Sequence, residues 1–174
     1  MYIYDSNGKL LLNIPIRHRS ALTGEPKEPG KHQLYKEVKI ENDFDWQKQH
    51  WRALKASYQT SPFFEFYEDE IYPLYHKKFD YLLDFNYACL DFVTEALQLD
   101  LEFQKTSEFI LHPEDKKDLR SLINAKAKFN FEPEEYTQVF QDKHGFLPNL
   151  SILDLIFNEG PNSLNYLEEQ EFKF

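Results

Sequence analysis

The sequence contains a single cysteine, Cys89, which stands among apolar neighbours in the stretch FNYACLDFV. One thiol cannot form an intramolecular disulfide or complete a zinc cluster, and the six histidines include no HxxxH or HxH pair. We therefore expect no metal site, and we interpret Cys89 as a small core residue rather than a nucleophile. A lone reduced thiol fits a reducing compartment.

Long apolar runs and an excess of positive charge are also missing. No stretch approaches the roughly 20 apolar residues that cross a bilayer, so we expect no membrane span and a cytoplasmic location. The formal net charge of -10 opposes nucleic-acid binding, which depends on neutralising phosphates with Lys and Arg. No phosphate-binding loop, dinucleotide fingerprint or catalytic triad is visible, and no cofactor is expected.

The 174 residues, 41% of them hydrophobic, suffice for one domain with a sizeable core. Residues 2–4 and 10–16 predict two strands, because the intervening Asn7-Gly8 tolerates the positive dihedrals of a tight hairpin. Alternation of charged and apolar residues over 37–41 predicts a further short strand. Beyond Leu99 the pattern is weaker: 101–110 and 136–140 resemble strands, and 113–126 a short helix.

Helices dominate the middle of the sequence and recur near its end. Apolar residues three and four positions apart predict a helix with two packed faces over 46–58, capped from among Asn42, Asp43 and Asp45. Ser61-Pro62 should end it and start another, which Pro73 should break or kink. Further helices are expected over 74–83, 85–97 and 152–158, the last with Gly160 near its C-cap. We predict a single, mainly helical α+β domain over 1–174 with a small N-terminal antiparallel sheet.

One region near the N-terminus is locally basic. Residues 17–39 carry Arg17, Arg19, Lys27, Lys31, Lys36 and Lys39, with His18 and His32 beside them. If these side chains converge, they could hold a small anion such as the diphosphate of a nucleotide sugar, because charge-assisted hydrogen bonds act locally. The simpler alternative is a solvated loop.

Among aromatic residues, Trp46 and His50 share one helix face. A neutral imidazole can act as a general base, and its aromatic neighbours could stack on a sugar or base. The alternative for His50 is one structural hydrogen bond beneath packed aromatics, and for His32 a solvated loop position. Glu65, Glu68, Asp69 and Glu70 are best explained as a solvated helix face, and the dense aromatics of 63–92 as core or interface.

Three stretches occur in an order typical of one family: YDSNGKLLLNIPI (4–16), DWQKQHWRALKASYQTSPFFEFYEDE (45–70) and NLSILDLIFNEGP (149–161). Together they resemble the WbqC-like family, whose members occur among bacterial genes for lipopolysaccharide and other surface polysaccharides. Relatives usually begin with an apolar strand, a Gln-Pro-x-Tyr-like element and an Asn-Arg dipeptide. These are absent ahead of Met1, so we expect the chain to be short at its N-terminus relative to the family.

The resemblance implies a role in surface polysaccharide biosynthesis and leaves two functions open. The first is a transferase that modifies an activated sugar. Phosphate would be held by Arg17, Arg19 or Lys31, the pocket lined by Trp46 or Tyr58, and the proton moved by His50 or His32. The second is a noncatalytic module that binds a nucleotide sugar or an enzyme of the pathway. A chain made nonfunctional by truncation is a third possibility.

Overall fold

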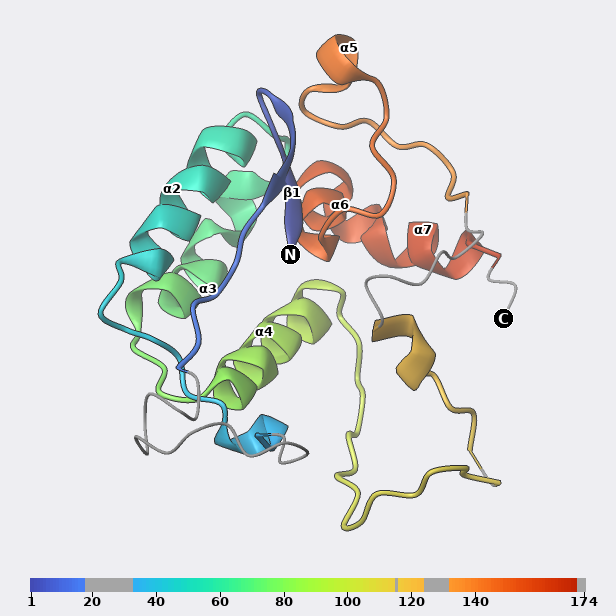
Figure 1. Ribbon diagram of the computed structural model, residues 1–174. Coiled ribbons are helices and arrows are strands. Elements are labelled where there is room, and N and C mark those ends of the chain that lie inside the picture. The colour runs from blue at the N-terminus through green and yellow to red at the C-terminus, as the bar shows by residue number, and fades with distance from the viewer. Residues whose placement is uncertain (18–32, 115, 124–131, 172–174) are drawn as a thin grey trace.

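The computed structural model describes residues 1–17, 33–114, 116–123 and 132–171. These residues are mainly helical, with a two-stranded antiparallel sheet at the N-terminus, which confirms the expected α+β class (Figure 1). Strand β1 (Tyr2–Asp5) pairs with β2 (Gly8–Leu11) in the register Tyr2 to Leu11. Gly8 has φ +108°, a conformation that glycine adopts readily, so the predicted hairpin is confirmed.

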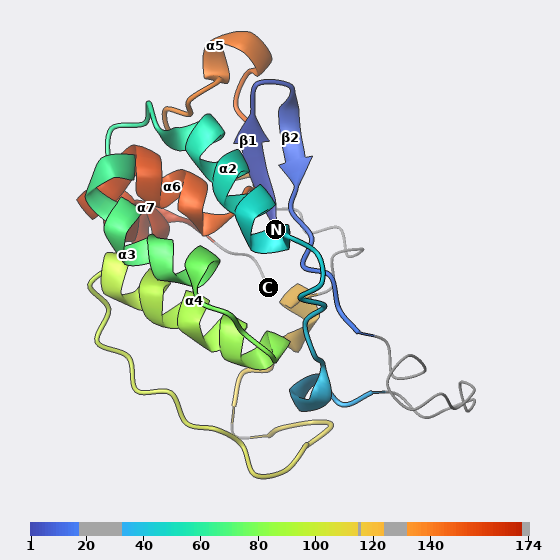
Figure 2. The same ribbon diagram turned by 90° about the vertical axis from the view of Figure 1, so that its left-hand side faces the viewer.

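Three helices form the first half of the core: α2 (Trp46–Tyr58), α3 (Phe64–His76) and α4 (Leu82–Ala96). The hairpin lies between α2 and α6 (Ile152–Glu159), as the two views together show (Figures 1 and 2). Tyr58, Phe64 and Phe157 pack edge to face or tilted at 5.1–5.3 Å between ring centroids. This arrangement brings residues from both ends of the chain into one core.

The break predicted at Pro73 is wrong, because α3 continues through it to His76. Proline has no amide to donate within the helix, so one helical hydrogen bond is lost, but the turn that follows is kept, since the amide of Lys77 donates to Pro73 O at 2.9 Å. The end of the helix is also tied down from outside, since Gln47 Nε2 donates to the carbonyls of Leu74 (2.8 Å) and Lys77 (2.7 Å). The helix expected over 74–83 therefore holds only for 74–76, which belong to α3, and for 82–83, which begin α4; residues 77–81 form the connection between the two helices.

Towards the C-terminus, α5 (Gln141–His144), α6, η3 (Gly160–Asn162) and α7 (Ser163–Glu169) follow one another. Ser151 caps α6, its Oγ accepting from the amide of Leu153 at 3.4 Å. Gly160, with φ +53°, ends the helix. The range of this helix and its end at Gly160 match the sequence-based expectation.

The other predicted strands do not form in the described residues. Around 37–41 the chain makes η1 (Tyr35–Glu37) and two isolated bridges, Ile16 to Ile40 and Lys39 to Tyr81. Residues 101–110 and 136–140 pair with no strand, and η2 (Arg120–Ile123) occupies part of the expected 113–126 helix. A β-like pattern needs a partner edge, and here none lies alongside. In the described ranges, no helix is long and apolar enough to cross a membrane.

A buried carboxylate, Asp154 on α6, joins the hairpin, α2 and the 136–147 segment. Its Oδ1 accepts from the Tyr58 hydroxyl at 2.8 Å, and Oδ2 accepts from Tyr136 (2.7 Å) and Gln138 (3.0 Å). The Tyr58 oxygen also accepts from the backbone amide of Tyr4 at 3.0 Å. We call these five residues the Asp154 hub. Because every member has a partner, the hub fixes the relative positions of the elements that carry them.

Candidate functional site

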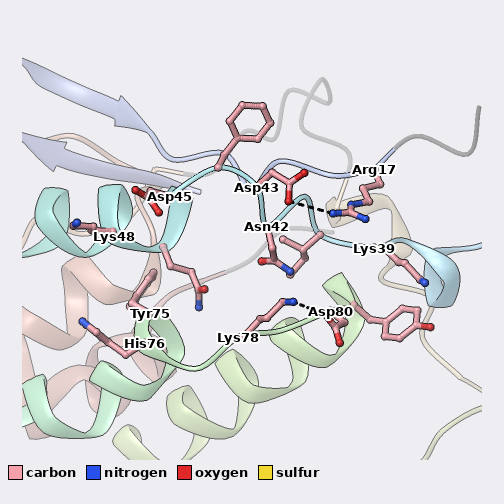
Figure 3. Close-up of a pocket in the computed structure, with 14 residues that line it drawn as sticks. Arg17, Lys39, Asn42, Asp43, Asp45, Lys48, Tyr75, His76, Lys78 and Asp80 are labelled. Atoms are coloured by element: carbon pink, nitrogen blue, oxygen red, sulfur yellow. Dashed lines mark ion pairs between the residues drawn. The ribbon is translucent and has the colours of Figure 1, made fainter. Parts of the chain in front are cut away.

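A polar cleft of about 790 Å³ opens where residues 39–48 face residues 75–81, with Arg17 at one end (Figure 3). Its volume lies within the roughly 300–1,000 Å³ typical of small-molecule sites. Four basic side chains line it, and three acidic ones accompany them. The basic residues are Arg17, Lys39, Lys48 and Lys78; the acidic residues are Asp43, Asp45 and Asp80.

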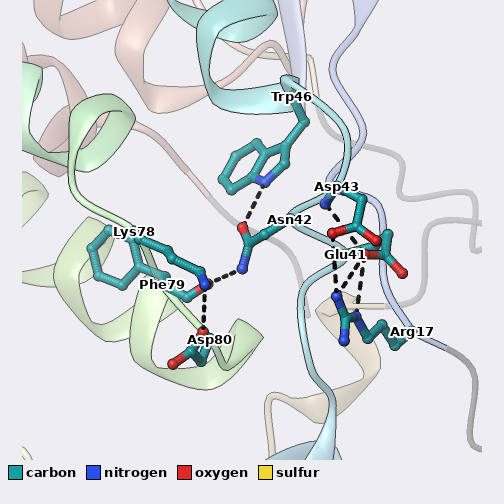
Figure 4. Close-up of polar contacts among 8 residues, drawn as sticks. All are labelled: Arg17, Glu41, Asn42, Asp43, Trp46, Lys78, Phe79 and Asp80. Atoms are coloured by element: carbon teal, nitrogen blue, oxygen red, sulfur yellow. Dashed lines mark hydrogen bonds and ion pairs between the residues drawn. The ribbon is translucent and has the colours of Figure 1, made fainter. Parts of the chain in front are cut away.

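Backbone and side-chain hydrogen bonds hold the two walls of the cleft together. The amide of Ile40 donates to the carbonyl of Asp80 at 2.9 Å, and the amide of Leu82 donates to Val38 at 2.9 Å. Asn42 bridges the walls, because its Nδ2 donates to Phe79 O at 2.9 Å while its Oδ1 accepts from Trp46 Nε1 at 3.5 Å (Figure 4). The cleft is therefore built before any ligand arrives.

Arg17 is positioned by acidic neighbours on the same side of the cleft. Its Nε and Nη2 donate to Glu41 Oε1 at 3.2 and 2.9 Å, and Nη2 lies 3.7 Å from Asp43 Oδ1. These hydrogen bonds from the guanidinium lower the pKa of the Glu41 carboxyl below its usual value. Glu41 thus stays ionised and orients Arg17, whose remaining donors can serve an anion.

The lysine ammonium groups of the cleft differ in their ion pairing. Lys39 and Lys48 form no ion pair with the residues that the structure describes, whereas Lys78 Nζ lies 3.6 Å from Asp80 in an exposed pair. Lys39 Nζ instead lies 5.6 Å from the centre of the Tyr81 ring. Exposed aromatic surface is close by, since Phe44 is 63% and Tyr81 38% exposed. Cations and accessible rings therefore occur in the same cleft.

His76 also lines the cleft, although it was not among the predicted site residues. Its Nδ1 lies 2.9 Å from the carbonyl of Tyr72, which can only accept, so Nδ1 carries the proton in the neutral ring and Nε2 is left unprotonated. The imidazole is stacked on Tyr72, with 3.5 Å between ring centroids. An exposed, oriented imidazole can remove or deliver a proton. No spacing in the sequence distinguishes this histidine from the others.

The predicted site residues do not gather in one place. Trp46 is 4% exposed and packs edge to face on His50 at 5.2 Å and on Phe85 at 5.3 Å. Tyr58 is fully buried, its hydroxyl used by the Asp154 hub. Neither lines the cleft, and of the described residues in the proposed set only Arg17 does. Their roles in substrate binding remain predictions.

His50 faces a separate, apolar cavity rather than the cleft. Its Nε2 lies 3.0 Å from the carbonyl of Asn13 and therefore donates to it. Burial lowers the pKa of the imidazole, although this hydrogen bond opposes the shift. His50 is thus held neutral near pH 7. The geometry agrees with a histidine making one structural hydrogen bond, and its part in proton transfer stays a prediction.

The remaining predicted residues, Arg19, Lys31 and His32, lie outside the described residues. Among the residues that can be placed, no group of three or more His, Cys, Asp or Glu side chains could hold a metal ion.

Comparison with known proteins gives two matches of different kinds. The model of the WbqC-like protein family matches residues 1–131 and 123–166. An uncharacterized protein of Mycobacterium tuberculosis, Rv1507c, is 26% identical over 162 residues, covering 78% of this chain and 70% of the relative. No solved structure matches.

Proposed function

Because this chain belongs to the WbqC-like protein family, we propose that it binds a nucleotide sugar in the cleft and serves bacterial surface polysaccharide biosynthesis. The observation that supports the proposal is that Arg17, Lys39 and Lys48 line one cleft together with exposed aromatic rings, although the chain as a whole has a net charge of -10. The family's usual occurrence among surface polysaccharide genes supplies the pathway.

The ligand class follows from the cationic, aromatic and acidic side chains that line the cleft. Guanidinium and ammonium groups form the strongest hydrogen bonds with phosphate oxygens, so they would hold the diphosphate. Phe44 and Tyr81 offer faces on which a base or sugar ring can stack. Asp45, on the same lining, can accept hydrogen bonds from sugar hydroxyls. The cleft thus supplies a partner for each part of a nucleotide sugar.

The reaction that fits best is transfer of an acyl group from an acyl donor onto the activated sugar. His76 would act as the general base: its unprotonated Nε2 would take the proton from the sugar hydroxyl or amine that attacks the acyl carbonyl. It would then give this proton to the donor's leaving group as the bond between the acyl group and that leaving group breaks. The hydrogen bond from Nδ1 to Tyr72 would keep the ring in the required tautomer. Arg17 and the lysines would hold the diphosphate so that the acceptor group stays in place.

A noncatalytic module that binds the nucleotide sugar, or an enzyme of the pathway, is the second candidate. One observation favours it: His50, the histidine in the segment most typical of the family, is 6% exposed and lies away from the cleft. If the protein is a noncatalytic module that binds the nucleotide sugar, the sugar would still lie in the cleft, and His76 would not be needed.

Binding can be tested with UDP-glucose as the probe, by isothermal titration calorimetry. Replacing Lys48 with glutamine removes one charge-assisted contact and should weaken binding about tenfold or more, since such a bond contributes about 1.5–3 kcal/mol. Lys55→Gln removes the same charge from the same helix outside the cleft lining and should leave the Kd unchanged. Equal Kd values for Lys48→Gln and Arg17→Gln and the unmodified protein would reject the cleft as the site.

Catalysis is tested by mass spectrometry of UDP-sugars incubated with acyl or amino donors. If the protein is a transferase, His76→Gln should lower kcat about 10²- to 10⁴-fold with little change in KM, because glutamine cannot take up the proton. His144→Gln, whose native Nε2 contacts Ser6 O at 3.0 Å, is the matched control. Unmodified protein that binds UDP-glucose yet forms no product would favour the noncatalytic module.

A further inference from the structure

A second hollow, the apolar cavity of about 400 Å³, lies between α2, α3, α4 and the start of α6. Buried apolar side chains such as Ile71, Phe92 and Leu153 form its walls. Asn13 and Asn86, both exposed, also belong to the lining, and we call them its mouth. An apolar interior with a few polar groups at one end is the usual form of a site for a small organic ligand.

The described side chains that line the cavity are uncharged. Among the residues that the structure describes, the lining includes no Asp, Glu, Lys or Arg side chain, although 29% of the chain consists of these residues. The one charged group that the described residues bring to this lining is the N-terminal ammonium of Met1, which donates to Leu12 O at 2.9 Å. The titratable side chains of the lining, His50, Cys89 and Tyr75, are all kept neutral by burial, which lowers the pKa of the imidazole, raises that of the thiol to about 12 and raises that of the phenol. A charged ligand would find no counter-ion among these side chains, and the Met1 ammonium already donates to Leu12 O. An uncharged aliphatic ligand needs no such partner and loses no hydrogen bond on entering.

We propose that this cavity binds a neutral aliphatic chain, such as the acyl chain of an ester or amide, with its head group at Asn13 and Asn86. At about 30 Å³ for each water-sized group, 400 Å³ holds about a dozen such groups, which corresponds to a chain of roughly eight to twelve carbons. Asn86 Nδ2 already donates to the Tyr35 hydroxyl, so its oxygen, its second amide hydrogen and the Asn13 side chain are the groups that can meet an ester or amide.

The position of the cavity relates the chain to the cleft. Tyr75 of α3 contributes to the linings of both hollows. A chain seated in the cavity would therefore lie against the same side chain as a ligand in the cleft. The inference does not depend on the proposed function, because the cavity lining, apart from Tyr75, is formed by other residues.

The test measures uptake of the neutral fluorophore N-phenyl-1-naphthylamine and its displacement by 1-hexanol, 1-octanol and 1-decanol. We expect saturable binding of one fluorophore per chain, and alcohols that bind about fourfold more tightly for each added methylene until the cavity is full. Val93→Phe places a ring in the cavity and should abolish uptake. Ala56→Phe, on an exposed position of α2, should not.

A measurement on the unmodified protein guards against misfolding of the variant. Cys89, the single thiol, lines the cavity, so 1-decanol should slow its alkylation by N-ethylmaleimide at least threefold. UDP-glucose binding, measured in parallel, should be the same in Val93→Phe as in the unmodified protein. Two results would overturn the inference, even where UDP-glucose binding is confirmed. One is the absence of saturable uptake, as expected if a segment of the chain or a second copy fills the cavity. The other is uptake that Val93→Phe does not change.

Discussion

Replacing Asp154 with alanine should lower the free energy of unfolding by about 3–5 kcal/mol, because it leaves several buried donors without a partner. At about 2–4 °C per kcal/mol for a chain of this size, the melting temperature should fall by about 6–20 °C. Urea denaturation followed by circular dichroism measures the first quantity, and a thermal scan the second.

The expected loss follows from what alanine leaves behind. Asp154 is fully buried, and alanine would remove the acceptor shared by the Tyr58 and Tyr136 hydroxyls and the Gln138 amide. Each buried donor left without a partner costs about 1–3 kcal/mol. Glu168→Ala, on the exposed surface of α7, should change stability by no more than about 0.5 kcal/mol. A similarly small change for Asp154→Ala would mean that water replaces the carboxylate.

The isosteric Asp154→Asn variant adds a dependence on pH. Burial raises the pKa of Asp154 above its ordinary 3.8, so the folded state holds the proton more tightly than the unfolded chain. The stabilisation of the folded state by this tighter proton binding is fully present below about pH 3.8 and is lost as pH rises through the pKa of Asp154 in the folded state. The stability of the unmodified protein relative to Asp154→Asn should therefore decrease above about pH 4. The opposite slope would show that the three donors outweigh burial.

Gly160→Ala should lower the free energy of unfolding by about 2–6 kcal/mol for two separate reasons. A Cβ there would lie 2.5 Å from Cγ and Cδ1 of Phe63, far inside van der Waals contact. The backbone at φ +53° and ψ −125° is also in a region that glycine alone adopts readily. Phe63 is held in turn by its amide, which donates to Phe157 O at 3.0 Å.

A double-mutant cycle separates the two reasons. In the Phe63→Ala background the steric part disappears, so Gly160→Ala should be about 1–3 kcal/mol less harmful than in the unmodified chain. Gly145→Ala is the matched control, because Gly145 has φ +75° but nothing within 4 Å of the added Cβ. The loss of stability in Gly145→Ala should therefore come from backbone strain alone. Equal effects at both glycines would show that Phe63 moves aside without loss.

The local elements were predictable from the sequence where short-range chemistry decides them. Asn7-Gly8 identifies the hairpin, and Ser151 with Gly160 delimits α6. Pro73 was misread because its effect depends on its place in the last turn and on Gln47, which reaches it from another helix. The alternating residues of 37–41 could not reveal that only single bridges connect them to Ile16 and Tyr81.

The cleft was harder to predict, because its walls are distant in sequence and no motif marks them. Arg17 was found through local charge, but Lys48 and His76 lie on helices whose pairing only the tertiary structure shows. Asp154 did leave a signal, because a carboxylate inside the apolar run LSILDLIF needs hydrogen-bond donors if it is buried. Which residues supply them, Tyr58, Tyr136 and Gln138, is shown only by the tertiary structure.

The Asp154 hub also sets when this chain can fold during synthesis. Ile3 and Tyr4 are fully buried, yet the residues that cover them include Tyr58, Asp154 and the 140–145 backbone that accepts from the Tyr4 hydroxyl. At about 5–20 residues per second, a ribosome needs roughly 8–30 s to make the intervening 150 residues. Through that interval the first strand emerges without its cover, so a nascent chain stalled before Asp154 should be open to proteases and to chaperones that bind apolar strands.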